Sequence, residues 1–175
     1  MGKIKKQPRV KLITGLIFSQ QGILDKAQKD LIRHFGKIDF ESNALAFTHT
    51  DYYKKEFGSS LYRKFLSFQK LIDPAKLAEI KILTNKIEEK YKNPHDCRLI
   101  NIDPGYLDFA KLILATTKDY AHRIYLKKGI YAEITLSYQD KQFKPLAWTY
   151  PDYRANEYSD IFNTIRDIYA GQRKN

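Results

Sequence analysis

Residues 11–35 read KLITGLIFSQQGILDKAQKDLIRHF, and this stretch decides the fold class. Lys11–Ser19 is apolar almost throughout, which is typical of a strand that is covered on both faces. Gln21–Phe35 carries apolar residues at helical spacing, and Gly36 follows as a C-terminal stop signal. A buried strand that leads directly into an amphipathic helix predicts a domain of mixed α and β structure.

The remaining sequence continues this pattern of short strands and amphipathic helices. Further strands are expected at Ile38–Phe47, Leu61–Leu71, Cys97–Asp103, Lys111–Lys118, Ala121–Leu126 and Ile130–Tyr138, and further helices at Pro74–Tyr91 and Asn156–Tyr169. The first six elements follow the order β-α-β-β-α-β, which is the order of ferredoxin-like folds. We therefore predict a single α+β domain over residues 11–172, with a ferredoxin-like β-α-β-β-α-β core, an enlarged and mainly antiparallel sheet and a C-terminal helix. Residues 1–10 are predicted to form a basic N-terminal arm.

The composition is that of a folded domain with an uneven distribution of charge. Hydrophobic residues make up 43% of the 175 residues and aromatic residues 14%, which excludes a disordered chain. The net charge is +11, and five basic residues without an acidic one lie in residues 1–11. Nearly half of the excess charge is therefore expected within residues 1–11, most of it on the N-terminal arm, so nucleic acid is the weaker of the predicted partners.

Several classes of protein are excluded by what the sequence lacks. No stretch approaches 18 consecutive apolar residues, so we expect no membrane partner. The single cysteine, Cys97, excludes an internal disulfide and agrees with a cytoplasmic location. The four histidines have no paired spacing, so we predict no metal site. The motif G-x-x-x-x-G-K-[ST] of phosphate-binding loops is missing. The sequence does not identify a cofactor.

The most informative local pattern is a hairpin late in the chain. His122–Leu126 and Ile130–Leu136 are joined by Lys127-Lys128-Gly129, which fits a three-residue loop with glycine in the left-handed position. The resulting register opposes Arg123 with Glu133 as a cross-strand ion pair. One face then carries Arg123, Tyr125, Tyr131 and Glu133, and the opposite, apolar face carries His122.

Three functions are compatible with these residues. The first is binding of a nucleotide or another phosphorylated small ligand, because the planar fork of an arginine matches phosphate oxygens and aromatic rings stack on bases. The residues expected to contact such a ligand are Asp103, Lys118, Arg123, Tyr125, Tyr131, Glu133, Tyr150, Asp152 and Arg154. The purely structural alternatives are an ion pair between Arg123 and Glu133, a turn at Asp103, and a rigid segment over Trp148–Arg154.

The second function is that of an enzyme acting on a phosphoester or a related bond, with or without a metal. Asp119 and His122 would be its acid and base, and Lys118 and Arg123 would hold the anion. A buried structural role for His122 is the alternative. The third function is nucleic-acid binding, which rests on the positive charge alone.

The chain as a whole resembles the bacterial and archaeal family known as domain of unknown function 4416. The resemblance rests on residues 10–12, 15–19, 50–53, 63–68, 71–74, 101–107, 114–119, 122–126, 129–133 and 148–154. These include Thr50-Asp51-Tyr52-Tyr53 and Asn101-Ile102-Asp103-Pro104-Gly105-Tyr106-Leu107, and the similarity extends from about residue 8 to 154. Membership implies an uncharacterised cytoplasmic protein of one domain. No catalytic residues can be carried over from the family.

Overall fold

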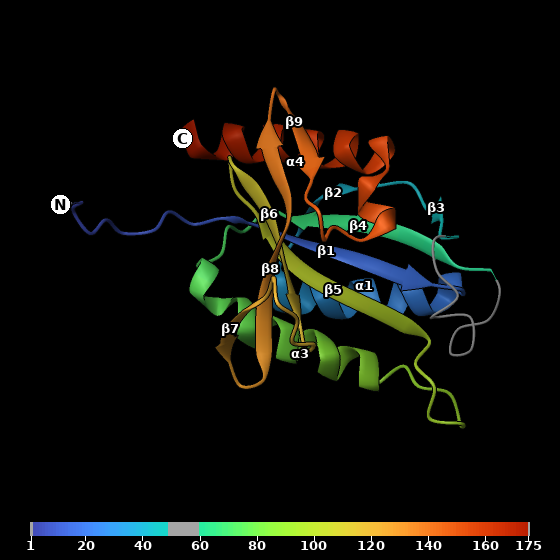
Figure 1. Ribbon diagram of the computed structural model, residues 1–175. Coiled ribbons are helices and arrows are strands. Elements are labelled where there is room, and N and C mark those ends of the chain that lie inside the picture. The colour runs from blue at the N-terminus through green and yellow to red at the C-terminus, as the bar shows by residue number, and fades with distance from the viewer. Residues whose placement is uncertain (1, 49–59, 175) are drawn as a thin grey trace.

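The computed structural model describes residues 2–48 and 60–174, so the Thr50–Tyr53 motif lies outside the described residues. Figure 1 shows the arrangement of the elements. The strands are β1 (Lys11–Phe18), β2 (Ile38–Glu41), β3 (Leu45–Ala46), β4 (Tyr62–Phe68), β5 (Ile100–Leu107), β6 (Lys111–Thr116), β7 (Ile124–Lys127), β8 (Ile130–Gln139) and β9 (Gln142–Pro145). The helices are α1 (Gln21–Phe35), α3 (Leu77–Glu89) and α4 (Asn156–Lys174), with short 3-10 helices η1 (Pro74–Lys76) and η2 (Pro151–Arg154).

The described strands form one antiparallel sheet. Its order is β2-β4-β1-β5-β6-β8-β7, with β3 beside β4 and β9 beside β8. Helices α1 and α3 cover one face and α4 covers the other (Figure 1). This arrangement confirms the prediction of an α+β fold with a large antiparallel sheet and a C-terminal helix. No described helix is both long and apolar enough to span a membrane.

The central position of β1 explains its continuous apolar sequence. Every residue of Lys11–Phe18 is buried. Leu12 and Leu16 pack with the helices α1 and α3, whereas Ile13 packs with the aromatic residues of α4. A strand buried on both faces has no solvent side, so its sequence shows no alternation of polar and apolar residues.

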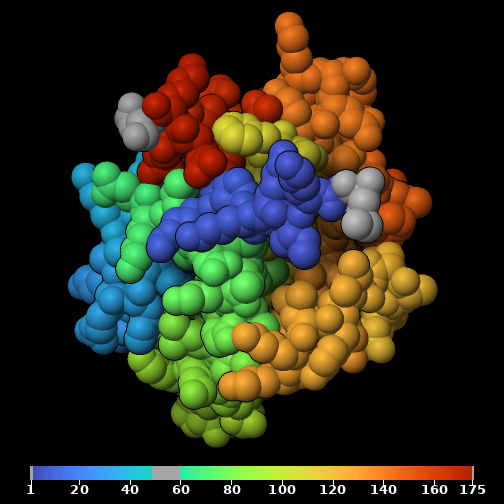
Figure 2. Space-filling view, turned by 90° about the vertical axis from the view of Figure 1, so that its left-hand side faces the viewer, coloured from blue at the N-terminus to red at the C-terminus, as the bar shows by residue number. Residues whose placement is uncertain are grey.

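The N-terminal arm lies outside this layered core. Residues 2–9 are exposed, and the buried Val10 is the first residue to bridge to the body, at Ile72. Figure 2 shows the molecule from the side toward which the arm projects, with the arm in blue and α4 in red above it. The hydroxyl of Tyr169 in α4 donates a hydrogen bond to the carbonyl oxygen of Arg9 (2.8 Å), which holds the base of the arm.

Two local expectations about strands are corrected by the structure, and a third strand was not predicted. The segment around Pro104 and Gly105 is not a turn but the middle of β5, which continues to Leu107. Strand β7 begins at Ile124, because residues 121–123 belong to a turn. The short strand β9 had no recognisable apolar pattern.

A bulge in β8 changes which side chains share a face. Leu112 of β6 opposes Leu136 of β8, whereas Ile113 opposes Ile134, so one extra residue of β8 is accommodated between them. Leu114 then opposes Glu133. Because Leu112 and Leu114 point to the α4 side of the sheet, the bulge places Glu133 on that side as well.

The sheet splits between β5 and β6. Strand β5 pairs with β1 from Ile100 to Leu107 but with β6 only from Gly105 onward. Pro104 has no N–H to offer a neighbouring strand, and the pairing with β6 begins directly after it. At Gly105 the strands approach so closely that a Cβ atom would lie 2.3 Å from the carbonyl oxygen of Ile113. Before this point β5 and β6 diverge and leave a space within the sheet.

Candidate functional site

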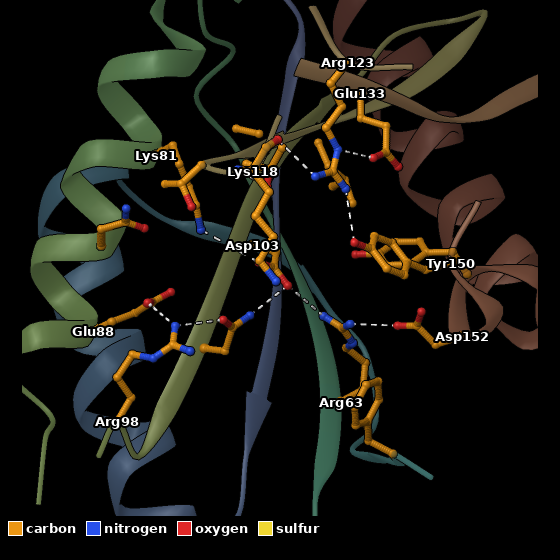
Figure 3. Close-up of a pocket in the computed structure, with 18 of the residues that line it drawn as sticks. Arg63, Lys81, Glu88, Arg98, Asp103, Lys118, Arg123, Glu133, Tyr150 and Asp152 are labelled. Carbon is orange, nitrogen blue, oxygen red and sulfur yellow. Dashed lines mark hydrogen bonds and ion pairs between the residues drawn. The ribbon is translucent and has the colours of Figure 1, made fainter. Parts of the chain in front are cut away.

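The space between the diverging strands is a cavity of about 690 Å³. Helix α3 borders it on one side, and the segment of Tyr150–Tyr153 borders it on the other (Figure 3). Its basic lining residues are Arg63, Lys81, Arg98, Lys118 and Arg123, and its acidic ones are Glu88, Glu89, Asp103, Glu133 and Asp152. The cavity thus gathers charged side chains from elements that are distant in sequence.

Asp103 of β5 lies near the centre of this cavity (Figure 3). Its Oδ2 accepts a hydrogen bond from Asn101 Nδ2 (2.8 Å) and lies 3.4 Å from Arg63 Nη1, while its Oδ1 lies 3.8 Å from Lys81 Nζ. The carboxylate is 27% exposed. It is therefore accessible from the cavity although it is surrounded by cationic groups.

Arg63 closes the cavity on the α4 side. Its Nη2 donates to Asp152 Oδ2 at 2.7 Å, and its guanidinium carbon lies 5.4 Å from the centre of the Tyr153 ring. Gly15 of β1 leaves room for this arrangement, because a Cβ there would lie 3.0 Å from Arg63 Nη1 and 3.1 Å from the Tyr153 hydroxyl. Burial alone would lower the pKa of Arg63, but the adjacent phenolic and carboxylate groups raise it above the ordinary value.

Helix α3 replaces the missing strand along the open edge of β5. Glu88 Oε1 accepts a hydrogen bond from the backbone N–H of Ile102 (2.6 Å), and Lys81 Nζ donates to the carbonyl oxygen of Ile102 (3.0 Å). Two side chains thus satisfy backbone groups that β6 does not reach. Arg98 Nη1 donates to Glu88 Oε2 at 2.9 Å. Burial raises the pKa of Glu88 even though Lys81 and Arg98 lie nearby.

Arg123 is held at the upper edge of the cavity by all three of its nitrogens. Nε donates to Glu133 Oε2 (2.8 Å), Nη1 to the carbonyl oxygen of Lys118 (3.0 Å) and Nη2 to the hydroxyl of Tyr150 (3.1 Å). Burial alone would lower the pKa of Arg123, but its hydrogen bonds with Glu133 and Tyr150 raise it above the ordinary value. The predicted ion pair between Arg123 and Glu133 is therefore present.

Glu133 is bonded unevenly. Its Oε2 contacts both Arg123 Nε and His122 Nε2, the latter at 3.1 Å. Its Oε1 is buried and has no hydrogen-bond partner among residues 2–48 and 60–174. The side chain as a whole is 3% exposed. Within the described part of the chain, one oxygen of this buried carboxylate thus has two polar contacts and the other has no hydrogen-bond partner.

The structure brings together six of the residues predicted to contact a ligand. The cavity is lined by Asp103, Lys118, Arg123, Glu133, Tyr150 and Asp152. It is not lined by Asp119, His122, Tyr125, Tyr131 or Arg154. Arg154 instead donates to the carbonyl oxygens of Thr149 and Ala147, each at 2.9 Å, and so fixes the segment that precedes it.

The expected position of His122 on the apolar face is wrong. Its ring lies nearly parallel to those of Tyr120 and Trp148, with centres 6.0 Å and 5.5 Å away, and its Nε2 contacts Glu133. The alternation of strand faces does not reach His122, because β7 begins two residues later at Ile124. His122 therefore supports the carboxylate of Glu133 from behind the cavity.

Five charged residues of the cavity were not foreseen, namely Arg63, Lys81, Glu88, Glu89 and Arg98. Two of them had a recognisable signal. Lys81 and Glu88 stand seven residues apart, on the same buried face of α3 as Leu77 and Thr84. Charged residues at apolar positions of an amphipathic helix point into the protein, where they need a partner. Arg63, Glu89 and Arg98 carry no such signal.

These features define a class of α+β proteins in which a split antiparallel sheet encloses a charged cavity. The family described as Domain of unknown function (DUF4416) matches residues 8–169 of the chain, and the protein belongs to this family. A search of curated proteins and a search of solved structures found no match. Within the described ranges, no group of three or more His, Cys, Asp and Glu side chains is placed to hold a metal ion.

Proposed function

We propose that the protein binds a phosphorylated small molecule, such as a nucleotide, in the cavity between β5 and β6. The observation that carries this proposal is the convergence of basic side chains from β4, α3 and the segment after β6 on one cavity (Figure 3). Guanidinium and ammonium groups are the usual protein partners of phosphate. The volume of about 690 Å³ falls in the range of roughly 300–1,000 Å³ that is common for small-molecule sites.

The burial of these charges supports a binding role over a structural one. Replacing a buried ion pair by apolar residues of similar size is often neutral or stabilising, so buried pairs are poor devices for stability alone. Arg63 and Asp152 form such a pair, and Arg123 and Glu133 form another. Both pairs border the same cavity, which makes recognition of a charged ligand the simpler explanation for their presence.

The ferredoxin-like assignment of the core is part of this proposal. It is supported by the neighbour order β2-β4-β1-β5, in which adjacent strands are antiparallel, and by the position of α1 and α3 on one face. In that description, β6, β7, β8 and β9 extend the sheet beyond β5. The cavity then lies at the junction between the core and the extension.

The binding proposal is tested by thermal shift across nucleotides and sugar phosphates, followed by calorimetric titration of the compounds that raise the melting temperature. A ligand present at 100 times its Kd stabilises a protein by about 2.7 kcal/mol, which is several degrees in a chain of this size. Lys81→Met should weaken binding at least tenfold. Lys86→Met, which removes the same charge from the exposed face of α3, should not. Equal binding by both variants, or no binding to wild type, would contradict the proposal.

A phosphoester-cleaving enzyme is the second candidate, and one contact favours it. His122 shares Glu133 Oε2 with Arg123, so the imidazole is one side chain away from the cavity. In this alternative water attacks phosphorus, Asp119 takes the proton of that water, and His122 protonates the leaving oxygen. Hydrolysis of p-nitrophenyl phosphate, with and without magnesium, tests it. Activity that survives unchanged in His122→Asn would contradict the assignment.

A further inference from the structure

The hydrogen bonds of Glu133 indicate that a ligand must supply a hydrogen-bond donor. An arginine and a carboxylate commonly form two parallel hydrogen bonds that use both carboxylate oxygens. Here Arg123 gives Glu133 a single bond from Nε, because its other nitrogens are directed to the carbonyl oxygen of Lys118 and the hydroxyl of Tyr150. His122 approaches the same oxygen of Glu133. Oε1 is therefore left without a partner in the part of the chain that the structure describes.

An unpartnered carboxylate oxygen in a buried site is costly, since it has lost its contacts with water and gained none in return. Glu133 lines the cavity, and Figure 3 shows its carboxylate beside the guanidinium of Arg123. A ligand in the cavity that offered a hydroxyl group would complete its hydrogen bonding. A phosphate group would not, because an anion repels the carboxylate and a phosphate dianion has no proton to donate.

The balance of charge limits how many phosphate groups the ligand carries. Among the described residues that line the cavity, five are basic and five are acidic. A phosphomonoester brings a charge of about −1.5 to −2 at pH 7, and each further phosphate adds to it. Asp103 lies beside Lys81 and Glu88 beside Arg98, and both carboxylates would repel the additional charge. A cavity selective for triphosphates would need a clear excess of basic residues.

We infer that the ligand is a phosphomonoester of a hydroxylated ring, a sugar phosphate or a nucleoside monophosphate, with a ring hydroxyl donating to Glu133 Oε1. This inference rests on the proposed function. The phosphate lies toward Lys81 and Lys118, which extend into the cavity from different sides in Figure 3. The ring lies toward Glu133 and Tyr150. Sugar phosphates and nucleoside monophosphates share this chemistry, and the experiment separates them.

The experiment is calorimetric titration of the full chain at constant ionic strength. The compounds are ribose 5-phosphate, adenosine 5′-monophosphate, adenosine 5′-triphosphate, and the 2- and 3-deoxy forms of the first two. A monophosphate should bind at least tenfold more tightly than the triphosphate. At least one deoxy form should lose about tenfold in affinity, as expected when a hydrogen bond to a buried carboxylate is removed. Binding of ribose 5-phosphate as tight as that of the nucleotide assigns the site to sugar phosphates, and much weaker binding assigns it to nucleotides.

Glu133→Gln provides the protein side of the test, because an amide is a weaker acceptor for the hydroxyl. In this variant the ratio of the affinities for the hydroxylated and the deoxy ligand should fall toward one. Glu157→Gln, which changes an exposed residue of α4, is the matched control and should keep the preference. If Glu133→Gln fails to fold, the deoxy series on the wild type still decides. Equal binding of hydroxylated and deoxy forms, or tighter binding of the triphosphate, would overturn the inference and leave the phosphate site standing. If no phosphorylated compound binds, the proposed function itself falls.

Discussion

Arg63 and Asp152 are 89 positions apart in the sequence, yet Arg63 Nη2 and Asp152 Oδ2 are 2.7 Å apart in a buried ion pair. Their side chains are 4% and 7% exposed. The pair joins β4, which lies between β1 and the edge strands β2 and β3, to the short helix η2 that precedes α4. It thereby fixes one wall of the cavity and attaches the C-terminal part of the chain to the core.

Asp152→Asn should lower the free energy of unfolding by about 3 kcal/mol, because it leaves the charge of Arg63 buried with a poorer partner. Removing one partner of a buried ion pair usually costs roughly 3–5 kcal/mol. The loss should lie at the low end of this range, because Asp103 remains 3.4 Å from Arg63 Nη1. Urea denaturation measures it. Asp160→Asn, on the exposed side of α4, should change stability by less than about 0.5 kcal/mol. Equal losses of stability in Asp152→Asn and Asp160→Asn would contradict a stabilising role for the ion pair between Arg63 and Asp152.

Gly105→Ala should destabilise the protein by about 2 kcal/mol or more. Its Cβ would lie 2.3 Å from the carbonyl oxygen of Ile113, and a backbone atom cannot move aside without separating β5 from β6. Gly171→Ala in α4 meets nothing within 4 Å and should instead stabilise by about 0.5–1 kcal/mol. Denaturation curves of both variants give the two signs. If Gly105→Ala stabilised the protein, β5 and β6 could not lie as close together at this position as the structure places them.

Asp30 joins α1 to the end of α3. Its Oδ2 accepts hydrogen bonds from the Tyr91 hydroxyl (2.9 Å) and from Lys90 Nζ (3.2 Å). The hydrogen bond from Tyr91 is the main reason that the pKa of Asp30 is lowered. An aspartate with a lowered folded pKa contributes stability above its unfolded pKa of about 3.9, and this is lost as the pH falls through the folded value. Asp30→Asn should therefore reduce the melting temperature at pH 7 by about 2–4 °C.

The difference between wild type and Asp30→Asn should stay constant from about pH 7 to pH 5 and shrink below about pH 4. Asp25→Asn, an exposed position of the same helix, is the control and should show little effect at any of these pH values. A difference that grows as the pH falls has the wrong sign and would refute the role given to Asp30.

Removal of residues 1–7 tests the nucleic-acid alternative. The deletion removes Lys3, Lys5 and Lys6 but keeps Arg9, whose carbonyl oxygen is held by Tyr169. We expect the melting temperature to change little, and any binding of single-stranded DNA to be weak, to fall steeply with salt and to disappear with the deletion. Tight binding of the truncated chain at about 0.2 M salt would instead place a nucleic-acid site on the folded body.

The fold was more accessible to sequence reasoning than the site, for physical reasons. Continuous burial of Lys11–Phe18 and the helical spacing of α1 are local patterns, and local patterns predict strands and helices. The split at Pro104 and Gly105 is a relationship between two strands. The same dipeptide that forms turns elsewhere lies here within β5, where the pairing with β1 continues and the pairing with β6 begins. Local sequence does not distinguish these two outcomes.

The site was predicted only where its residues lie close together in the chain. Arg123 and Glu133 could be paired because a short hairpin opposes Ile124 with Ala132, the residues next to them in the chain. Arg63 lines the cavity because of the order of the strands in the sheet, and this order depends on contacts across the whole molecule. His122 was misplaced because one turn at residues 121–123 interrupts the alternation of faces. Lys81 and Glu88 could have been identified from their position on the buried face of α3.

The most direct test of the central claim is amide NMR on the full chain during titration with adenosine 5′-monophosphate, and separately with inorganic phosphate. We expect saturable shifts at residues 81–89, 100–105, 116–123 and 150–153, which border the cavity from both sides of the split sheet. Shifts confined to the N-terminal arm at residues 2–9, or spread over the surface without saturation, would contradict a ligand site between β5 and β6.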